Sequence, residues 1–303
     1  MTRGTALAWI SLAIVYLVWG STYLGIRVAV TTIPPYLMTG TRFLIAGTLL
    51  FGLQWLAAKE RPALPRPAEL LRIAIVAVSL IVVGNGLLCL AETRVESGTS
   101  ALLLASTPIW MLLLDAMLAR KAPAAPAVGG VLLGTAGIAL LVGKGAGHAD
   151  LLFAGVIMIA SISWAAGSIY ARSSEHRPLT APLEMTLGGA ISVVVGLLLG
   201  EASHLRIAAI SAPSLWGMLW LITAGAMLGY SAYAYAVRTL PTSTVATYGY
   251  VNPVVAVILG ALLLHEPVTW NIVAGGAAVI ASVVLILVGS APVTRRDRAS
   301  SSP

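Results

Sequence analysis

Aromatic and polar side chains recur along this chain at intervals of three, four and seven residues, the spacing that places side chains on one face of a helix. Faces of Trp and Tyr can stack on an aromatic ligand or attract an ammonium group, while amides and hydroxyls fix a ligand's orientation. This is the chemistry of binding rather than of bond making. We therefore predict a substrate-binding site lined by Trp19, Tyr23, Asn85, Trp110, Trp164, Ser168, Tyr230, Tyr233, Tyr248 and Asn252.

These residue types also have purely structural interpretations. Trp and Tyr near helix ends commonly form a belt at the membrane–water interface, and buried amides can simply join neighbouring helices. Asn85 and Asn252 fit either role. The belt best explains four other tryptophans: Trp9, Trp55, Trp216 and Trp270.

Five charged residues lie in or beside the apolar stretches. A charge at membrane depth is costly and often marks a substrate or proton pathway. Near a helix end, a long side chain can instead reach water. The sequence favours the second interpretation and leaves the first open for Arg27, Arg42, Glu92, Asp115 and Arg172.

Residues suited to catalysis are sparse. All four histidines fall in expected loops or at helix ends, and Cys89 is the single cysteine, so neither a disulfide nor a Cys/His zinc site is expected. The run Gly143-Lys144-Gly145 lacks the spacing of a phosphate-binding loop. We predict no catalytic residue, no metal and no cofactor, which disfavours an intramembrane enzyme or a primary pump. No ion-selectivity filter is visible either.

The elements that position these side chains follow from composition. Of 303 residues, 58% are hydrophobic and only 10% are charged, against roughly 25% charged residues in soluble proteins. A membrane-spanning helix needs about 20 mostly apolar residues. The sequence predicts an all-α polytopic membrane protein with ten such helices, at 6–26, 37–58, 70–91, 96–118, 125–143, 150–171, 180–200, 214–237, 243–264 and 269–290.

Lys and Arg predict the orientation of these helices. Most of the 18 basic residues fall in the loops that share a side with the N-terminus. Because such loops stay in the cytoplasm, both termini are expected there. The net charge of +7 then reflects topology and anionic lipid headgroups, and no nucleic-acid partner is expected.

An internal repeat appears when the chain is shifted by about 145 residues. Gly84 then falls on Gly229, and Thr107-Pro108 falls on Asn252-Pro253. We predict two repeats, 1–146 and 147–291, followed by a basic cytosolic tail at 292–303. Five helices per repeat is an odd number, so the second repeat is inverted in the membrane, as in many secondary transporters. The paired prolines predict helix hinges at Pro108 and Pro253.

Several short motifs together resemble the drug/metabolite transporter superfamily, specifically its ten-helix exporters with paired EamA domains. The first repeat contributes Trp19-Gly20-Ser21-Thr22, Arg42-Phe43 and Pro108. The second contributes Asn252-Pro253, Leu264-His265-Glu266-Pro267 and Gly275-Gly276. The chain departs from many of these exporters after the fourth helix, where Arg120-Lys121 replaces a glutamate that Glu266 keeps in the second repeat.

The resemblance implies a secondary transporter of the bacterial inner membrane that exports small metabolites by alternating access. Amino acids are the leading substrate class, and YddG-type aromatic amino-acid exporters are the closest expectation. A lipid or lipid-linked sugar flippase of the same fold is the alternative. The lipid bilayer and the small-molecule substrate are the expected partners. Because one chain holds two fused repeats, a monomer would be a complete unit.

Overall fold

The structure, a computed structural model, describes residues 3–58, 64–120, 122, 124–142, 151–171, 179–240, 242–245 and 247–289. Within these ranges the chain forms helices joined by short connections, and no strand is present. The basic tail at 292–303 and Arg172 lie outside the described residues.

Ten apolar helical segments confirm the predicted all-α membrane fold. Seven are long and apolar enough to cross a bilayer, and three shorter apolar helices complete the set. The first repeat consists of α1 (Arg3–Ala29), α2 (Pro35–Ala57), α3 (Pro67–Ala77) with η1 (Val78–Asn85) and α4 (Gly86–Ala91), α5 (Ser97–Leu104) with α6 (Thr107–Ala119), and α7 (Ala125–Val142).

The second repeat follows the same order. It consists of α8 (Leu151–Ala171), α9 (Thr180–Leu198), α11 (Ala212–Trp220) with η3 (Leu221–Leu228) and α12 (Gly229–Thr239), α13 (Thr242–Val245) with α14 (Tyr248–Leu264), and α15 (Trp270–Gly289). Two short helices, α10 (Glu201–His204) and η2 (Ile207–Ala209), lie between α9 and α11.

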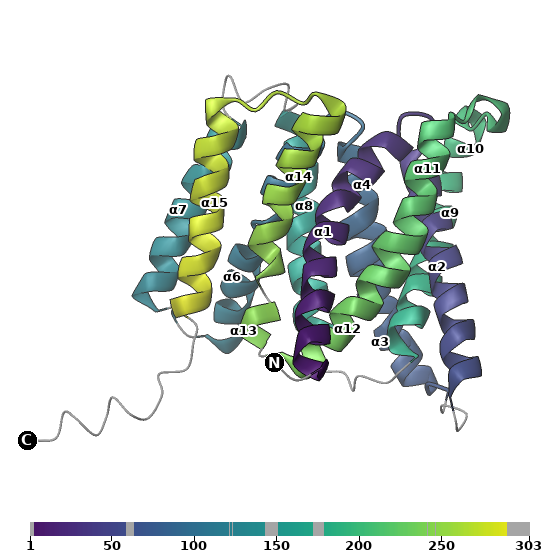
Figure 1. Cartoon of the computed structure of the whole chain (residues 1–303), viewed down its shortest axis with the longest axis horizontal. Coiled ribbons are helices and arrows are strands. Elements are labelled where there is room, and N and C mark those ends of the chain that lie inside the picture. Colours follow the sequence, from purple (N-terminus) through teal and green to yellow (C-terminus); the bar gives the residue numbers. More distant parts are fainter. Residues whose placement is uncertain are drawn as a thin grey trace, which may run out of the picture.

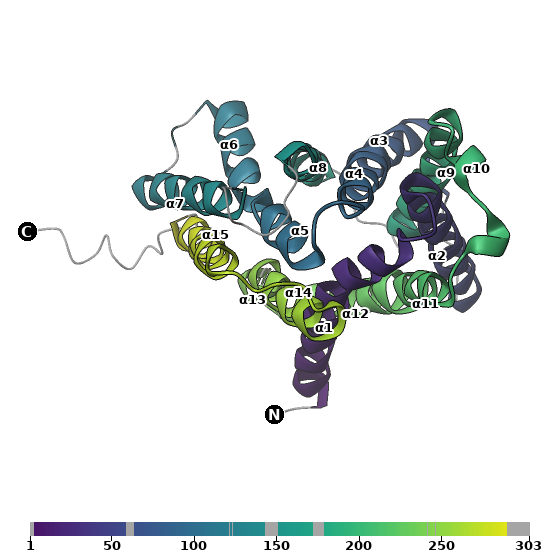
Figure 2. The ribbon, with the colours of Figure 1, turned by 90° about the horizontal axis from the view of Figure 1, so that it is seen from above.

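The two repeats pack against each other in a pseudo-twofold arrangement, in which corresponding helices are paired. Helix α7 lies along α15, and α2 lies along α9; Figure 2 shows these pairs at opposite ends of the molecule. Between them, α1 packs on α11, α12 and α14, while its counterpart α8 packs on η1, α4 and α6. This exchange of partners is what an inverted repeat predicts. We call the membrane side where α1 begins the near face and the side where it ends the far face (Figure 1).

Helix interruptions also occur in pairs. The third and eighth spans each contain an eight-residue π-helical segment, η1 and η3, between two α-helices. Such segments shift backbone hydrogen bonds and are frequent at functional sites. The fourth span breaks between α5 and α6, with Pro108 in the first turn of α6, whereas Pro253 lies inside α14. Because proline lacks an N–H, Pro253 removes a backbone hydrogen bond inside α14, whereas the first turn of α6 tolerates Pro108 where the span is already broken. The hinge role of both prolines stays a prediction.

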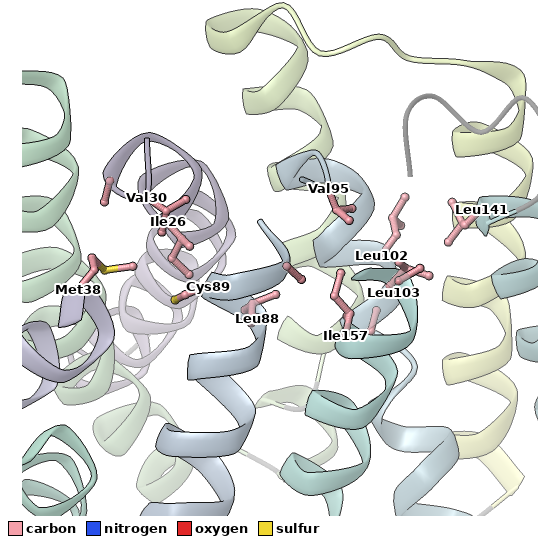
Figure 3. Packing of buried hydrophobic residues seen from close by; sticks show 14 of the residues in the cluster. Ile26, Val30, Met38, Leu88, Cys89, Val95, Leu102, Leu103, Leu141 and Ile157 are labelled. Carbon is pink, nitrogen blue, oxygen red and sulfur yellow. The ribbon is translucent and has the colours of Figure 1, made fainter. Parts of the chain in front are cut away.

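The largest buried cluster lies toward the far face and joins both repeats. It includes Ile26 of α1, Met38 of α2, Leu88 of α4, Leu102 of α5 and Ile157 of α8, as Figure 3 shows. The free thiol of Cys89 is buried within it. Because lipid is itself apolar, close packing rather than exclusion of water supplies most of the association energy of membrane helices. This core therefore seals the far half of the helix bundle.

Candidate substrate-binding site

Three aromatic residues from both repeats form one cluster. The ring of Trp19 (α1) lies 5.1 Å from that of Tyr233 (α12) and 5.2 Å from that of Tyr248 (α14), measured between centroids. The rings of Tyr233 and Tyr248 meet edge to face at 5.8 Å. Such edge-to-face pairs are favourable because a positive ring edge meets a negative ring face. The structure thus brings Trp19 of the predicted stripe on α1 together with Tyr233 of the eighth span and Tyr248 of the ninth.

Polar contacts fix this aromatic cluster. The Tyr16 hydroxyl is hydrogen-bonded to the Thr247 hydroxyl in the turn before α14. The side-chain amide of Asn252, oriented with its nitrogen toward α1, donates to the carbonyls of Tyr16 and Tyr248 (3.2 and 3.3 Å). The Trp19 indole N–H donates to the Gly225 carbonyl in η3 (3.1 Å). Asn252 therefore joins helices, and the indole satisfies a carbonyl within a π-helical segment, where α-helical bonding is disturbed.

A counterpart stands at the equivalent place in the other repeat. Trp164 on α8 lies against Gly84 of η1, as Trp19 lies against Gly229 at the end of η3. Here Asn85 donates from its side-chain nitrogen to the Leu80 carbonyl (3.0 Å), and the Ser163 hydroxyl donates to the Ser79 carbonyl (2.9 Å). Both π-helical segments thus accept hydrogen bonds from side chains. Each is also faced by a tryptophan of the other repeat: η1 by Trp164 of α8, and η3 by Trp19 of α1.

Trp19→Phe tests the indole's bond to η3. Phenylalanine keeps an aromatic ring but leaves the Gly225 carbonyl without its donor, which costs about 1–3 kcal/mol when the group is buried. We expect a lower melting temperature in detergent micelles than for the wild type. Trp216→Phe, at a position 69% exposed, is the control and should melt unchanged. Equal melting of both variants would contradict a structural role for this bond.

Two charged side chains are buried beyond the aromatic cluster. Arg42 of α2 is 5% exposed, and Glu92, in the turn after α4, is fully buried. Among the described residues, both Glu92 carboxylate oxygens and the Arg42 Nε and Nη1 atoms have no hydrogen-bond partner, while Arg42 Nη2 makes a long contact of 3.4 Å with the Asn85 amide oxygen. The Arg42 guanidinium also stacks 4.3 Å above the Phe43 ring. Arg42 therefore does not reach water, contrary to its expected position near a helix end.

The charge of Glu92 is sensitive to its neighbours. Burial raises the pKa of its carboxyl well above the ordinary value, Glu266 acts in the same direction, and Arg27 and Arg42 oppose them. The Arg27 guanidinium also donates to the Glu92 backbone carbonyl. A cation placed beside this carboxyl would stabilise its ionised form.

Tyr23 lies one helical turn beyond Trp19 on α1 and packs against the buried cluster that includes Leu88 and Cys89. Arg27 follows one turn later on the same stripe. At 1.5 Å per residue, the stripe from Trp19 to Arg27 spans about 12 Å.

The remaining predicted residues are more dispersed. Tyr230 packs with Phe43, Ile81 and Met185 between α2, η1 and α9. The indole nitrogen of Trp110, on α6, is buried without a hydrogen-bond partner. Within the part of the chain that the structure describes, no hydrogen bond joins the Ser168 side chain to these clusters. The sequence left a binding role open for Arg42 and Glu92, and the structure shows that both are buried. The pattern that indicates their burial is Asn85, Cys89 and Glu92 on one helical face, together with an arginine within an apolar span.

The sequence of this chain is similar to those of known proteins. The sequence profile of the EamA-like transporter family matches residues 6–143 and 151–288. The chain is 36% identical over 279 residues to the uncharacterized inner membrane transporter YedA of Escherichia coli K12, covering 90% of this chain and 88% of that protein. It is 23% identical to a probable amino-acid metabolite efflux pump of Salmonella typhimurium, covering 91% of this chain and 93% of that protein.

A solved structure supports the same fold. One crystal structure covers 97% of this chain and 99% of its own, with a TM-score of 0.62 and 15% identity. Identity at that level supports the fold alone. The profile match covers nearly the whole chain twice over, and the relatives named above are transporters. This chain is therefore a membrane transporter that belongs to the EamA-like transporter family.

Proposed function

We propose that this transporter exports neutral α-amino acids, with a preference for aromatic ones, across the bacterial inner membrane. The proposal rests on two sets of side chains, the buried Arg42 and Glu92 with their unpartnered polar atoms and the aromatic cluster of Trp19, Tyr233 and Tyr248, which we take as the two ends of one column along α1. One end of the column offers opposite charges, and the other offers aromatic faces. An α-amino acid with an aromatic side chain has the complementary arrangement.

The charged end suits the backbone of an amino acid. The Nε and Nη1 atoms of Arg42 are unpartnered within the described part of the chain, and each lies beside Nη2, whose contact with Asn85 is long. A carboxylate could therefore accept two parallel hydrogen bonds from Nη2 and one of these two neighbours. The two free oxygens of Glu92 would accept from the ammonium group. Unpaired charges buried at membrane depth are costly, and a zwitterion would pair both at once.

The aromatic end would hold the substrate's side chain. Tyr233 and Tyr248 present ring faces and edges around Trp19, which suits a flat, apolar group better than a charged one. Trp164 and Asn85 would form the opposite wall of the path at η1. Tyr230, Ser168 and Trp110 would line its course without contacting the aromatic cluster.

Access to the column would alternate between the two faces. None of the unpartnered Arg42 and Glu92 atoms is exposed to solvent, so substrate reaches them only when the helices separate. We place the near face, with both termini, in the cytoplasm, because the basic residues favour that orientation. The spans at Pro108 and Pro253 would bend as one repeat moves against the other. The name of the Salmonella relative, a probable amino-acid metabolite efflux pump, agrees with this substrate class.

Uptake into proteoliposomes tests the proposal. We expect saturable uptake of radiolabelled phenylalanine and leucine. Unlabelled phenylalanine should compete. Phenethylamine, which lacks the carboxylate, and phenylpropionate, which lacks the ammonium group, should compete at least about tenfold less well, because each leaves one buried charge unpaired. Absence of saturable amino-acid uptake would refute the proposed substrate class. Equal competition by all three compounds would refute the role of the charged pair.

A further inference from the structure

Two glutamates of the second repeat bind the first turns of two helices in the first repeat. The Glu201 carboxylate, from α10, accepts hydrogen bonds from the backbone N–H groups of Tyr36 (3.0 Å) and Leu37 (2.8 Å) at the start of α2. The first N–H groups of a helix have no partner within the helix and carry a partial positive charge. A carboxylate accepts hydrogen bonds from these N–H groups, and its negative charge is attracted to their partial positive charge.

Glu266 repeats this arrangement at another helix. Its carboxylate accepts from the backbone N–H groups of Ser97 (2.8 Å) and Gly98 (3.1 Å) and from the Ser97 hydroxyl (2.9 Å) at the start of α5. Helix α5 supplies no acidic residue of its own in this turn. The cap therefore comes entirely from the connection between α14 and α15.

Each carboxylate also has a space made for it in the preceding helix. A Cβ atom on Gly196 would come within 3.0 Å of a Glu201 oxygen, and one on Gly260 would come within 2.3 Å of a Glu266 oxygen. His265, in the left-handed conformation (φ 55°), ends α14 and turns the chain so that Glu266 points back across the helix end. The local backbone is thus shaped to deliver both carboxylates.

Both contacts lie on the far face. Helix α1 crosses from the near face, so α2 begins on the far face; α5 begins there as well, after α4 has crossed (Figure 1). Each contact joins the second repeat to the first. They therefore act as two latches between the repeats on one side of the membrane.

The position equivalent to Glu266 in the first repeat carries no carboxylate. A shift of about 145 residues places Glu266 on Lys121. The helix-ending geometry is shared, because Arg120 (φ 50°) ends α6 as His265 ends α14. The residue that follows is basic in the first repeat and acidic in the second, and a cation is unfavourable at a helix N-terminus. The asymmetry therefore lies in side-chain chemistry rather than in backbone shape.

We propose that Glu201 and Glu266 are positioning residues that latch the far face of this transporter closed. Opening of the far face then requires both caps to break, and the free energy of the caps sets how often that happens. The latches control opening of the far face. They do not depend on the proposed substrate, because they act whichever small molecule is carried.

Spin-label distances test the latches without any substrate. Labels at Arg94 and Val268, both exposed and on far-face turns of different repeats, report on the Glu266 latch. Labels at Arg94 and Ile207 report on the Glu201 latch. Cys89→Ala provides a background without a native thiol. In Glu266→Gln and Glu201→Gln we expect the longer-distance population of the corresponding pair to rise about fivefold, the size expected for losing a helix cap.

A matched control separates latching from loss of any helix cap. Glu69 caps the first turn of α3 through the Arg66 N–H (2.9 Å), but both residues belong to the first repeat. Glu69→Gln should leave both distances unchanged. Glu266→Asp and Glu201→Asp keep the charge with a shorter reach and should give intermediate shifts if a glutamine variant fails to fold. Distance distributions that stay at the wild-type values in all latch variants would overturn the proposal, even if amino-acid transport is confirmed.

Discussion

Arg42→Gln is expected to lower phenylalanine transport, measured as kcat/KM in proteoliposomes, by at least about thirtyfold. Glutamine keeps a hydrogen-bond donor but not the charged fork that would bind the substrate carboxylate. Losing one partner of a buried charge pair costs roughly 2–5 kcal/mol of binding free energy. Most of the loss should appear in KM, because the contact is made to bound substrate.

Substrate analogues that lack one charged group test Arg42 and Glu92 separately. Arg42→Gln should narrow the preference for phenylalanine over phenethylamine, which carries no carboxylate. Glu92→Gln should instead narrow the preference over phenylpropionate, which carries no ammonium group. Arg94→Gln is the matched control, since Arg94 is exposed two residues after Glu92 and should transport normally. Unchanged selectivity in both buried-charge variants would remove Arg42 and Glu92 from the binding site.

Gly189→Ala is expected to destabilise the protein by about 1–3 kcal/mol, the usual penalty for overpacking. Gly189 on α9 faces Gly40 on α2, and a Cβ atom added there would lie 2.3 Å from the Leu44 backbone nitrogen. Backbone cannot move aside as a flexible side chain can, so α2 and α9 would have to separate. A lower melting temperature and faster loss of the monodisperse peak on size-exclusion chromatography would report it.

Gly155→Ala on α8 provides the control for this substitution. A Cβ atom at Gly155 meets nothing within 4 Å, and alanine favours helix over glycine by about 1 kcal/mol. This variant should melt at the wild-type temperature or slightly above it. If the two variants melted alike, close backbone contact between α2 and α9 would not be a source of stability.

The helical architecture could be predicted from the sequence because lipid imposes a simple rule. Every backbone group in the hydrocarbon must be paired within its own segment, so long apolar stretches become helices. All ten predicted spans correspond to apolar helices of the structure. The inverted relation followed from counting helices, and the exchange of partners between α1 and α8 matches it. The division at residue 146 and the cytoplasmic termini stay predictions.

The π-helical segments and the broken spans were less accessible to sequence reasoning. Pro108 marked the break before α6, because proline tolerates the first turn of a helix but not its interior. Nothing in the run Val78–Asn85 distinguishes a π-helical segment from an α-helix. Its formation depends on donors that arrive from other helices, such as Ser163.

The candidate site was predicted in part. Helical spacing placed Trp19 and Tyr23 on one stripe and Tyr248 and Asn252 on another, and the structure brings Trp19, Tyr233 and Tyr248 into contact. Spacing along one helix says nothing about which other helix will face it. For that reason Tyr230 was grouped with Tyr233, although it packs against a different cluster between α2, η1 and α9.

The sequence by itself determined that lipid surrounds this protein, that its spans are helices and that they form two repeats. Those properties depend on composition and on neighbours within one helix, which are local. The tertiary structure alone decided that Arg42 and Glu92 are buried with polar atoms that lack partners among the described residues, and that Glu201 and Glu266 cap helices of the other repeat. The caps join residues about 165 to 170 positions apart. Their energies depend on burial and orientation, which arise only when separate helices pack together.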